Sequence, residues 1–267
     1  MKKSLLSLAA CSVFAFASLG ANAAFVPVTV DETILGVGTH VIDGTNSQGA
    51  VGKLNGTYNE VVTIDALGNF TSSAFATFGQ YANTNGNAIT FTQSGLGSQY
   101  SMYAVFTSTG VVNPPNGFLG FTGQFDLYID KSGDTSGSLG PTGSSPIGVN
   151  NPSGAGDDIK IASSNSLYYA VGTGVGTDTT AFRFLFDEFT LTAAGANYFV
   201  APNPFYLNVD VNGDFDAGLG AVAPGNYSTT GDLSANFFKV PEPTSLALIG
   251  LGLAGLGVVR RRKVAAV

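Results

Sequence analysis

Apolar and polar side chains alternate along much of the chain, with the two-residue period of a β-strand. Between Phe121 and Ile129, mostly large apolar residues occupy every second position. Phe182, Phe184 and Phe186 repeat this pattern further along the chain. Successive side chains of a strand point to opposite faces, so each set shares one face of a sheet. We expect these aromatic faces to form a hydrophobic core rather than an exposed ligand platform.

No long stretch has apolar residues at helical spacing, and the alternating or β-branched runs are separated by Gly, Asn and Pro. The predicted strands are Val26–Val30, Gly56–Ile64, Phe70–Phe78, Ala88–Thr92, Tyr100–Thr107, Leu119–Ile129, Asp158–Ala162, Ala181–Thr192, Tyr206–Val211 and Ser234–Val240. Lys131 to Asp157 is rich in Ser, Gly, Pro and Asn, which predicts one long surface loop. The predicted fold is all-β, an antiparallel β-sandwich with a jelly-roll-like arrangement.

The first residues have the pattern of a secretory signal peptide. Two lysines precede an apolar run from Leu5 to Leu19, which is expected to form a helix. Ala21 and Ala23 then provide the small residues that signal peptidase accepts. We therefore predict a signal peptide over residues 1–23, with cleavage after Ala23.

Cys11 is the only cysteine in the chain, and it leaves a second interpretation of the N-terminus open. Leu8 to Cys11 fits a lipobox, in which Cys11 would become a lipidated N-terminus. Cleavage after Ala23 would instead remove Cys11. The remaining chain would then have no disulfide, no thiolate chemistry and no Cys-based metal site.

The C-terminus combines a proline-bracketed segment, an apolar run and a basic end. The segment consists of Val240, Pro241, Glu242 and Pro243, and the basic end consists of Arg260, Arg261, Arg262 and Lys263. Ser245 to Val259 would form a helix of roughly 22 Å, shorter than the hydrocarbon core of a bilayer. The basic end should lie in the cytoplasm and the preceding β-domain outside. One interpretation of this tail is an ordinary short membrane anchor that is never cleaved.

This order of motif, apolar helix and basic cluster closely resembles the PEP-CTERM sorting signal, also called an ice-binding-protein C-terminal domain. The resemblance covers only residues 240–267 and leaves 24–239 as a separate extracellular domain. It implies that an exosortase of a Gram-negative bacterium cleaves the tail after transient anchoring in the inner membrane. It also implies release to a cell surface or matrix containing exopolysaccharide. The composition and Phe25–Glu32 resemble, more weakly, the flocculation-associated group of these proteins.

The predicted extracellular domain is strongly acidic. Between Ala24 and Val240 there are five basic and seventeen acidic residues, a net charge of −12. Such a surface repels nucleic acid and anionic lipid, so we expect no nucleic-acid partner. It can attract divalent cations, and acidity also keeps an exported protein soluble.

One acidic segment has the spacing of a calcium loop. Oxygen ligands recur at alternate positions, at Asp210, Asn212, Asp214 and Asp216. They resemble the first ligands of an EF-hand loop, which wrap one hard cation. Phe215 replaces the expected glycine, and Ala221 stands where the loop needs a bidentate glutamate. The segment is therefore a candidate calcium site, with a polar turn after a strand as the alternative.

Catalytic constellations are missing from the sequence. His40 is the only histidine and has no nucleophile motif around it. The carboxylates closest to a glycosidase pair are Asp126, Asp130, Asp187 and Glu188, and the last two point to opposite faces if they lie on a strand. We expect a non-enzymatic matrix or adhesion protein. The alternative is a glycan-binding module, assisted by calcium.

Overall fold

The computed structural model describes residues 24–45, 49–113, 117–137, 152–173, 181–203, 208–214 and 223–239. The segment from Phe25 to Lys239 forms one compact unit. The predicted signal helix, transmembrane helix and sorting motif lie outside the described residues. Within the described ranges, no helix has both the length and the apolar character needed to cross a membrane.

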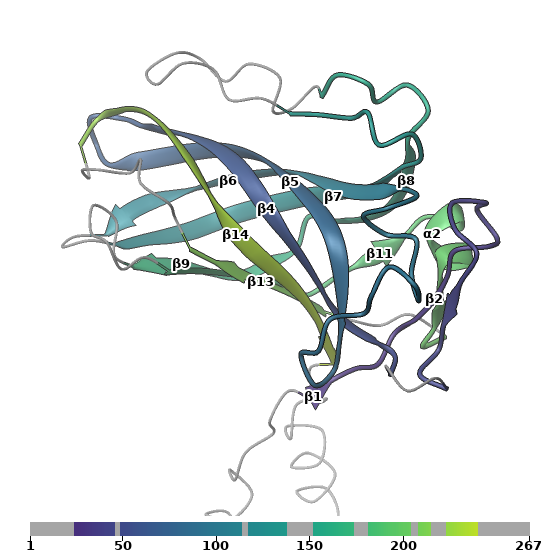
Figure 1. The fold of residues 1–267 in the computed structure, drawn as a ribbon. Coiled ribbons are helices and arrows are strands. Elements are labelled where there is room, and N and C mark those ends of the chain that lie inside the picture. Colours follow the sequence, from purple (N-terminus) through teal and green to yellow (C-terminus); the bar gives the residue numbers. More distant parts are fainter. Residues whose placement is uncertain are drawn as a thin grey trace, which may run out of the picture. The chain divides into compact units, whose positions relative to one another are not determined.

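Eight long or medium strands of the unit join into one closed, barrel-like antiparallel sheet (Figure 1). In hydrogen-bonded order they are β7 (Gly117–Asp130), β6 (Ser101–Asn113), β5 (Asn69–Asn83), β4 (Val51–Ile64), β14 (Gly225–Lys239), β13 (Asn208–Gly213), β10 (Ala181–Phe186) and β9 (Leu167–Thr173). The ring closes because β9 also pairs with the start of β7, from Gly117↔Thr173 to Leu119↔Val171. We call this ring the closed sheet and the space that it encloses the lumen.

The alternating pattern decides which side chains enter the lumen. Phe182, Phe184 and Phe186 are buried, whereas Arg183 between them is exposed. β7 follows the same rule at Phe125, Leu127 and Ile129, which are buried. Phe121, which was expected on the same buried face, is instead 63% exposed, because the register between β6 and β7 shifts at this residue. Because period-two alternation places every second side chain on one face, the lumen is also the hydrophobic core.

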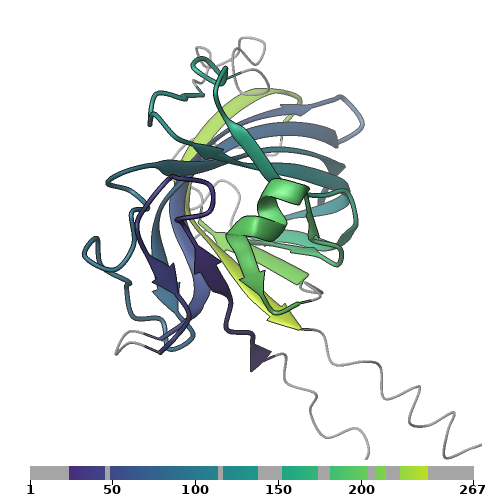
Figure 2. The same cartoon turned by 90° about the vertical axis from the view of Figure 1, so that its right-hand side faces the viewer.

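Short elements cover one end of the closed sheet. β2 (Thr29–Asp31) pairs with β3 (Val41–Ile42) and β12 (Phe199–Ala201) in a second, three-stranded sheet. The single described helix, α2 (Ala193–Tyr198), lies beside this sheet at the same end, as Figure 2 shows. β8 (Ile159–Ser164) and β11 (Thr190–Leu191) extend the main sheet from β7, and β1 (Ala24–Phe25) pairs with β14.

Local sequence explains why α2 begins where it does and how closely it packs. The Thr192 side chain caps the helix by accepting a hydrogen bond from the backbone N–H of Gly195, at 3.0 Å. A Cβ on Gly195 would lie 1.8 Å from the carbonyl oxygen of Ile161 in β8. Only glycine permits this approach, which holds the helix against the main sheet.

The all-β antiparallel prediction is confirmed, but the predicted sandwich is not found in the described residues. A sandwich needs two sheets facing each other, whereas here the strands form one ring that closes through β9 and β7. The sequence cannot distinguish these arrangements, because both bury every second side chain.

Two predicted strands need correction, and two elements of the structure were not predicted. Ala88–Thr92 is not a strand, because Gln93 and Ser94 donate their backbone N–H groups to the Thr90 carbonyl in a turn. The predicted Ala181–Thr192 strand divides into β10 and β11. Helix α2 and strand β9 were not predicted, since α2 is only six residues long and lacks a helical apolar repeat.

The predicted surface loop Lys131–Asp157 contains no named strand in its described parts, 131–137 and 152–157. It nevertheless contacts the outer face of the main sheet. Asp158, just beyond it, accepts hydrogen bonds from the Thr135 hydroxyl at 2.8 Å and the Tyr103 hydroxyl at 2.7 Å. Tyr103 stacks on Phe75, with ring centroids 5.1 Å apart. Phe75 and Tyr103 form a small cluster on the outer face, and they are therefore buried although they point away from the lumen.

Candidate functional site

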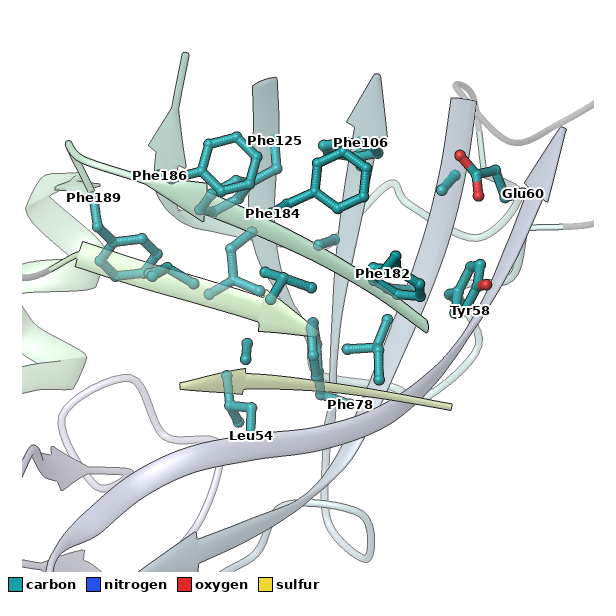
Figure 3. A pocket seen from close by; sticks show the side chains of 18 of the residues that line it. Leu54, Tyr58, Glu60, Phe78, Phe106, Phe125, Phe182, Phe184, Phe186 and Phe189 are labelled. Carbon is teal, nitrogen blue, oxygen red and sulfur yellow. The ribbon is translucent and has the colours of Figure 1, made fainter. Parts of the chain in front are cut away.

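The lumen contains a largely apolar cavity of about 80 Å³ (Figure 3). Its aromatic side chains contact one another mainly edge to face. The centroid distance is 4.8 Å for Phe125 and Phe186, and 5.4 Å for Tyr58 and Phe182. Edge-to-face packing fixes ring orientations, so the aromatic part of the wall has a defined shape.

Small residues on β5 and β6 account for the empty volume. Ala76 and Ala104 face each other directly across these strands, and Ala74 lies opposite Phe106. All three alanines line the cavity. An alanine pair leaves space that two larger aliphatic side chains would fill, which explains why the core is not closely packed here.

Glu60 is the charged residue in the lining of this cavity. It lies on β4 between Ala74 of β5 and Thr229 of β14, on the same face as Tyr58. Only 9% of its surface is exposed. Figure 3 shows its carboxyl group at one end of the lining residues, near Tyr58. A carboxyl group in this position is surrounded mainly by apolar walls rather than water.

Burial changes the acidity of Glu60. Desolvation raises the pKa of its carboxyl group to about 7, and a hydrogen bond with Ser72 acts in the opposite direction. Among the described residues, no basic side chain forms an ion pair with Glu60. A buried charge without a counter-ion is costly, and such groups gather at functional sites.

Sequence reasoning missed Glu60, although the pattern contained a signal for it. In the predicted strand Gly56–Ile64, period-two alternation puts Tyr58, Glu60 and Val62 on one face. A glutamate between large apolar residues on an inward face is unusual. Its burial could not be inferred before the direction of that face was known.

A second buried glutamate, Glu32, directly follows strand β2. It belongs to a network of hydrogen bonds near the end of the closed sheet that the three-stranded sheet covers. Its side chain accepts hydrogen bonds from the Ser94 hydroxyl at 2.7 Å, the Gly95 N–H at 2.9 Å and the Tyr100 hydroxyl at 2.9 Å. His40 Nδ1 lies 3.3 Å from the same carboxylate. Ser94 donates to Glu32 and not to His40, so these three residues do not form a nucleophile–base–acid triad.

The network continues through buried tyrosines. The Tyr198 hydroxyl is hydrogen-bonded to those of both Tyr100 and Tyr81, and Tyr81 also contacts the sulfur of Met102 at 3.5 Å. Desolvation raises the pKa of the Tyr81 hydroxyl. It also raises the pKa of the Tyr198 hydroxyl well above its ordinary value. The phenols therefore remain neutral donors and acceptors at physiological pH.

The structure places the candidate calcium ligands only in part. Asp210 and Asn212 belong to β13, and the Asp210 carboxylate pairs with Arg183 Nε at 2.8 Å. Asp214 follows the strand and accepts a hydrogen bond from the Asp232 N–H. Asp216 lies outside the described residues. The described residues contain no group of three or more His, Cys, Asp or Glu side chains that could hold a metal ion. The calcium site therefore stays a prediction.

The carboxylates considered for glycoside hydrolysis have separate structural contacts. Asp126 pairs with Lys160 at 2.7 Å. Asp130 is buried and accepts hydrogen bonds from the backbone of Gly133 and Thr135, which holds the turn after β7. Burial and the neighbouring charge of Glu188 raise the pKa of Asp187. Each carboxylate has its own local environment.

Exposed aromatic residues occur on two neighbouring strands. Phe121 of β7 is 63% exposed, and Tyr168 and Tyr169 of β9 are also exposed. β7 and β9 pair directly over Gly117–Leu119. We call Phe121, Tyr168 and Tyr169 the outer aromatic group. Aromatic faces of this kind can stack on other flat or apolar surfaces.

Comparison with known protein families concerns the segment that begins at the last residue of β14. Residues 239–263 match the family model described as the PEP-CTERM protein-sorting motif. The chain carries a PEP-CTERM sorting motif. The match contains the predicted Val240–Pro243 segment, the apolar run and Arg260–Lys263, which lie outside the described residues. No curated protein and no solved structure matches the chain.

The PEP-CTERM motif confirms the family resemblance drawn from the tail. It implies an exported protein that is sorted at the membrane by an exosortase. The motif begins at Lys239, where β14 ends, so the sorting signal directly follows the last strand of the closed sheet. The signal peptidase site at Ala21 and Ala23 lies outside the described residues and stays a prediction.

Proposed function

We propose that this chain is a non-enzymatic surface or extracellular-matrix protein that promotes biofilm or floc formation together with exopolysaccharide. The PEP-CTERM motif at residues 239–263 is the observation that carries the proposal. A motif that sends a protein to an exosortase is useful when the protein acts outside the inner membrane. The β-domain is then the part that functions after sorting.

The properties of the domain support an extracellular role. With cleavage after Ala23 it contains no cysteine, so its stability depends on the closed sheet and its core. The closed sheet leaves few unpaired strand edges, which limits unspecific association. Its net charge of −12 between Ala24 and Val240 favours solubility and attraction of divalent cations within an acidic matrix.

Deletion of the gene in the parent bacterium tests this function. We expect less aggregation and an altered matrix, both restored by the full chain. A Pro241→Ala, Pro243→Ala double variant should remain with the membrane fraction and fail to restore aggregation. Pro224→Ala, which changes a proline outside the motif, should restore it. Unchanged flocculation and matrix composition after deletion would overturn the proposal.

A glycan-binding module is the second candidate, and the outer aromatic group favours it. Phe121, Tyr168 and Tyr169 are exposed to solvent, and exposed aromatic rings can stack on sugar rings. Calorimetry with the strain's own polysaccharide, with and without chelator, tests both binding and calcium assistance. Tyr168→Ala should weaken binding, whereas Phe91→Ala, at an exposed aromatic residue elsewhere, should not. Absence of binding under both conditions would contradict this function.

A further inference from the structure

The surroundings of Glu60 in the lumen are unusual for a buried acidic residue. It is 91% buried, its neighbours on β5 and β14 are Ala74 and Thr229, and no described basic side chain pairs with it. The Ser72 hydroxyl is hydrogen-bonded to that of Ser108 at 2.7 Å, and it also interacts with the Glu60 carboxyl group and lowers its pKa. A carboxylate has room for several donors, so one hydroxyl leaves much of its capacity unused. A leucine or glutamine at this position would avoid the cost of desolvating an acid.

The space beside Glu60 is suitable for a small ligand. The cavity volume of about 80 Å³ corresponds to roughly six water-sized spheres. The alanine pair Ala76 and Ala104 provides part of this space, and aromatic and aliphatic side chains supply most of the remaining wall. The ligand must therefore be slender and mainly apolar, with a single polar group for Glu60.

Aromatic rings accompany the carboxyl group. Tyr58 lies two residues from Glu60 on the same face of β4, and its ring contacts that of Phe182 edge to face. The Tyr58 hydroxyl donates to the Asp214 carbonyl at 2.7 Å, which fixes the ring. A carboxylate next to aromatic rings is the environment in which proteins hold organic ammonium groups, through ion pairing and cation–π attraction.

We propose that the lumen binds a small organic ammonium ion, with its apolar body in the cavity and its charged nitrogen at the Glu60 carboxylate beside Tyr58. The ligand supplies the counter-ion that the described residues do not provide. This binding does not depend on the proposed matrix function, because it concerns the lumen and not the sorting motif or the outer surface.

The protonation of Glu60 should control this binding. On the lumen side of the described parts of β4, β5, β6, β10, β13 and β14, the other titratable groups near Glu60 are the phenols of Tyr58 and Tyr227. Among these groups Glu60 is the single carboxyl group. Glu60 alone should therefore set the pH dependence. Because the ammonium ion prefers the carboxylate form, affinity should rise as the pH increases from 6 to 8.

Calorimetric titration of the full chain with n-butylammonium, n-butanol and butyrate, at pH 6 and pH 8, tests the proposal. We expect n-butylammonium to bind in a one-to-one complex, more tightly at pH 8. n-Butanol should bind more weakly and without pH dependence, and butyrate should not bind at pH 8. Charge-assisted hydrogen bonds are stronger than neutral ones, so Glu60→Gln should weaken n-butylammonium binding about tenfold or more.

Two further variants separate binding in the lumen from other effects. Glu188→Gln removes the same charge from the exposed surface and should leave n-butylammonium binding unchanged. Ala76→Leu fills the cavity and should abolish binding of both n-butylammonium and n-butanol, provided that the thermal transition persists. Absence of n-butylammonium binding, equal affinity for n-butanol, or an unchanged affinity in Glu60→Gln would each overturn the proposal.

Discussion

Glu32 and Glu60 are both buried glutamates, but their surroundings differ in almost every respect. Glu32 is fully buried and accepts hydrogen bonds from Ser94, Gly95 and Tyr100, with His40 Nδ1 at 3.3 Å. Glu60 has the Ser72 hydroxyl and an apolar cavity. The first carboxylate is surrounded by donors from separate segments, whereas the second faces empty space.

The difference indicates what each residue does. Hydrogen bonds from several elements to Glu32 fasten the three-stranded sheet to the segment around Ser94, which is a structural role. Glu60 interacts with one hydroxyl, from the neighbouring strand β5, and its desolvation opposes folding when it is ionised. A residue that costs stability and has unused hydrogen-bonding capacity is a better candidate for ligand binding.

Removal of Glu32 should have the largest effect. Glu32→Ala leaves the Ser94, Gly95 and Tyr100 donors buried without their acceptor, and should lower the free energy of unfolding by about 3–5 kcal/mol. Urea denaturation of both proteins at pH 7 measures the loss. Glu60→Ala, a truncation of the same size, should cost much less or increase stability. Similar losses for the two variants would contradict the division of roles.

Removal of the Glu60 charge should have the next largest effect, and only above acidic pH. The pKa of Glu60 rises from its ordinary 4.5 to about 7 on folding. The folded state therefore binds the proton more tightly, and this contribution is complete below pH 4.5 and lost as the pH rises to 7. Relative to the wild type, Glu60→Gln should gain about 3 kcal/mol of stability between pH 4 and pH 8.

Denaturant unfolding of the wild type, Glu60→Gln and Glu188→Gln across this pH range measures that gain. The Glu188 variant controls for the general effect of removing one negative charge. Parallel stability curves for the wild type and Glu60→Gln would mean that the lumen does not perturb the carboxyl group.

The tyrosine network should respond more moderately. Tyr198→Phe removes the hydroxyl that joins Tyr100 to Tyr81, and should cost about 1–2 kcal/mol because buried polar groups lose a partner. Thermal and denaturant unfolding measure this change. Tyr168→Phe, at an exposed position, should stay within about 0.5 kcal/mol of the wild type. A neutral Tyr198→Phe would show that the network contributes little stability.

An exposed ion pair should have the smallest effect. Lys160 and Asp126 approach to 2.7 Å, but both side chains are about 40% exposed to solvent. Water screens such a pair, so Lys160→Met should lower the free energy of unfolding by less than about 1 kcal/mol. The same denaturation experiment at low and high salt measures it. A loss as large as that of Glu32→Ala would show that surface charge, and not the buried network, dominates stability.

Local patterns predicted much of this fold, while long-range pairing was beyond them. The Phe182, Phe184 and Phe186 alternation correctly indicated a buried face. Each long strand overlaps a predicted one, although most were predicted too short, and the prediction for β14 covers only its end. The closure of the ring depends on pairing between Leu119 and Val171, which lie far apart in the sequence. Nothing in the local pattern distinguishes a strand that closes a ring from one that ends a sandwich.

The functional residues show the same limit. The sorting motif was recognisable because its parts are consecutive in the sequence. Glu60 interacts with Ser72 and lines the same cavity as Ala76 and Ala104, and strand pairing brings β4, β5 and β6 together. The Asp210–Asp216 spacing indicated a loop, but β13 continues to Gly213 and Asp210 pairs with Arg183. Asp216 lies outside the described residues, so the calcium site stays a prediction.

The pKa of Glu60, measured by NMR titration of its side-chain carboxyl carbon in the full chain, tests the account most directly. We predict a value of about 7 without ligand and a decrease when n-butylammonium is added, because the bound cation stabilises the carboxylate. A value near the ordinary 4.5, unchanged by n-butylammonium, would contradict the account.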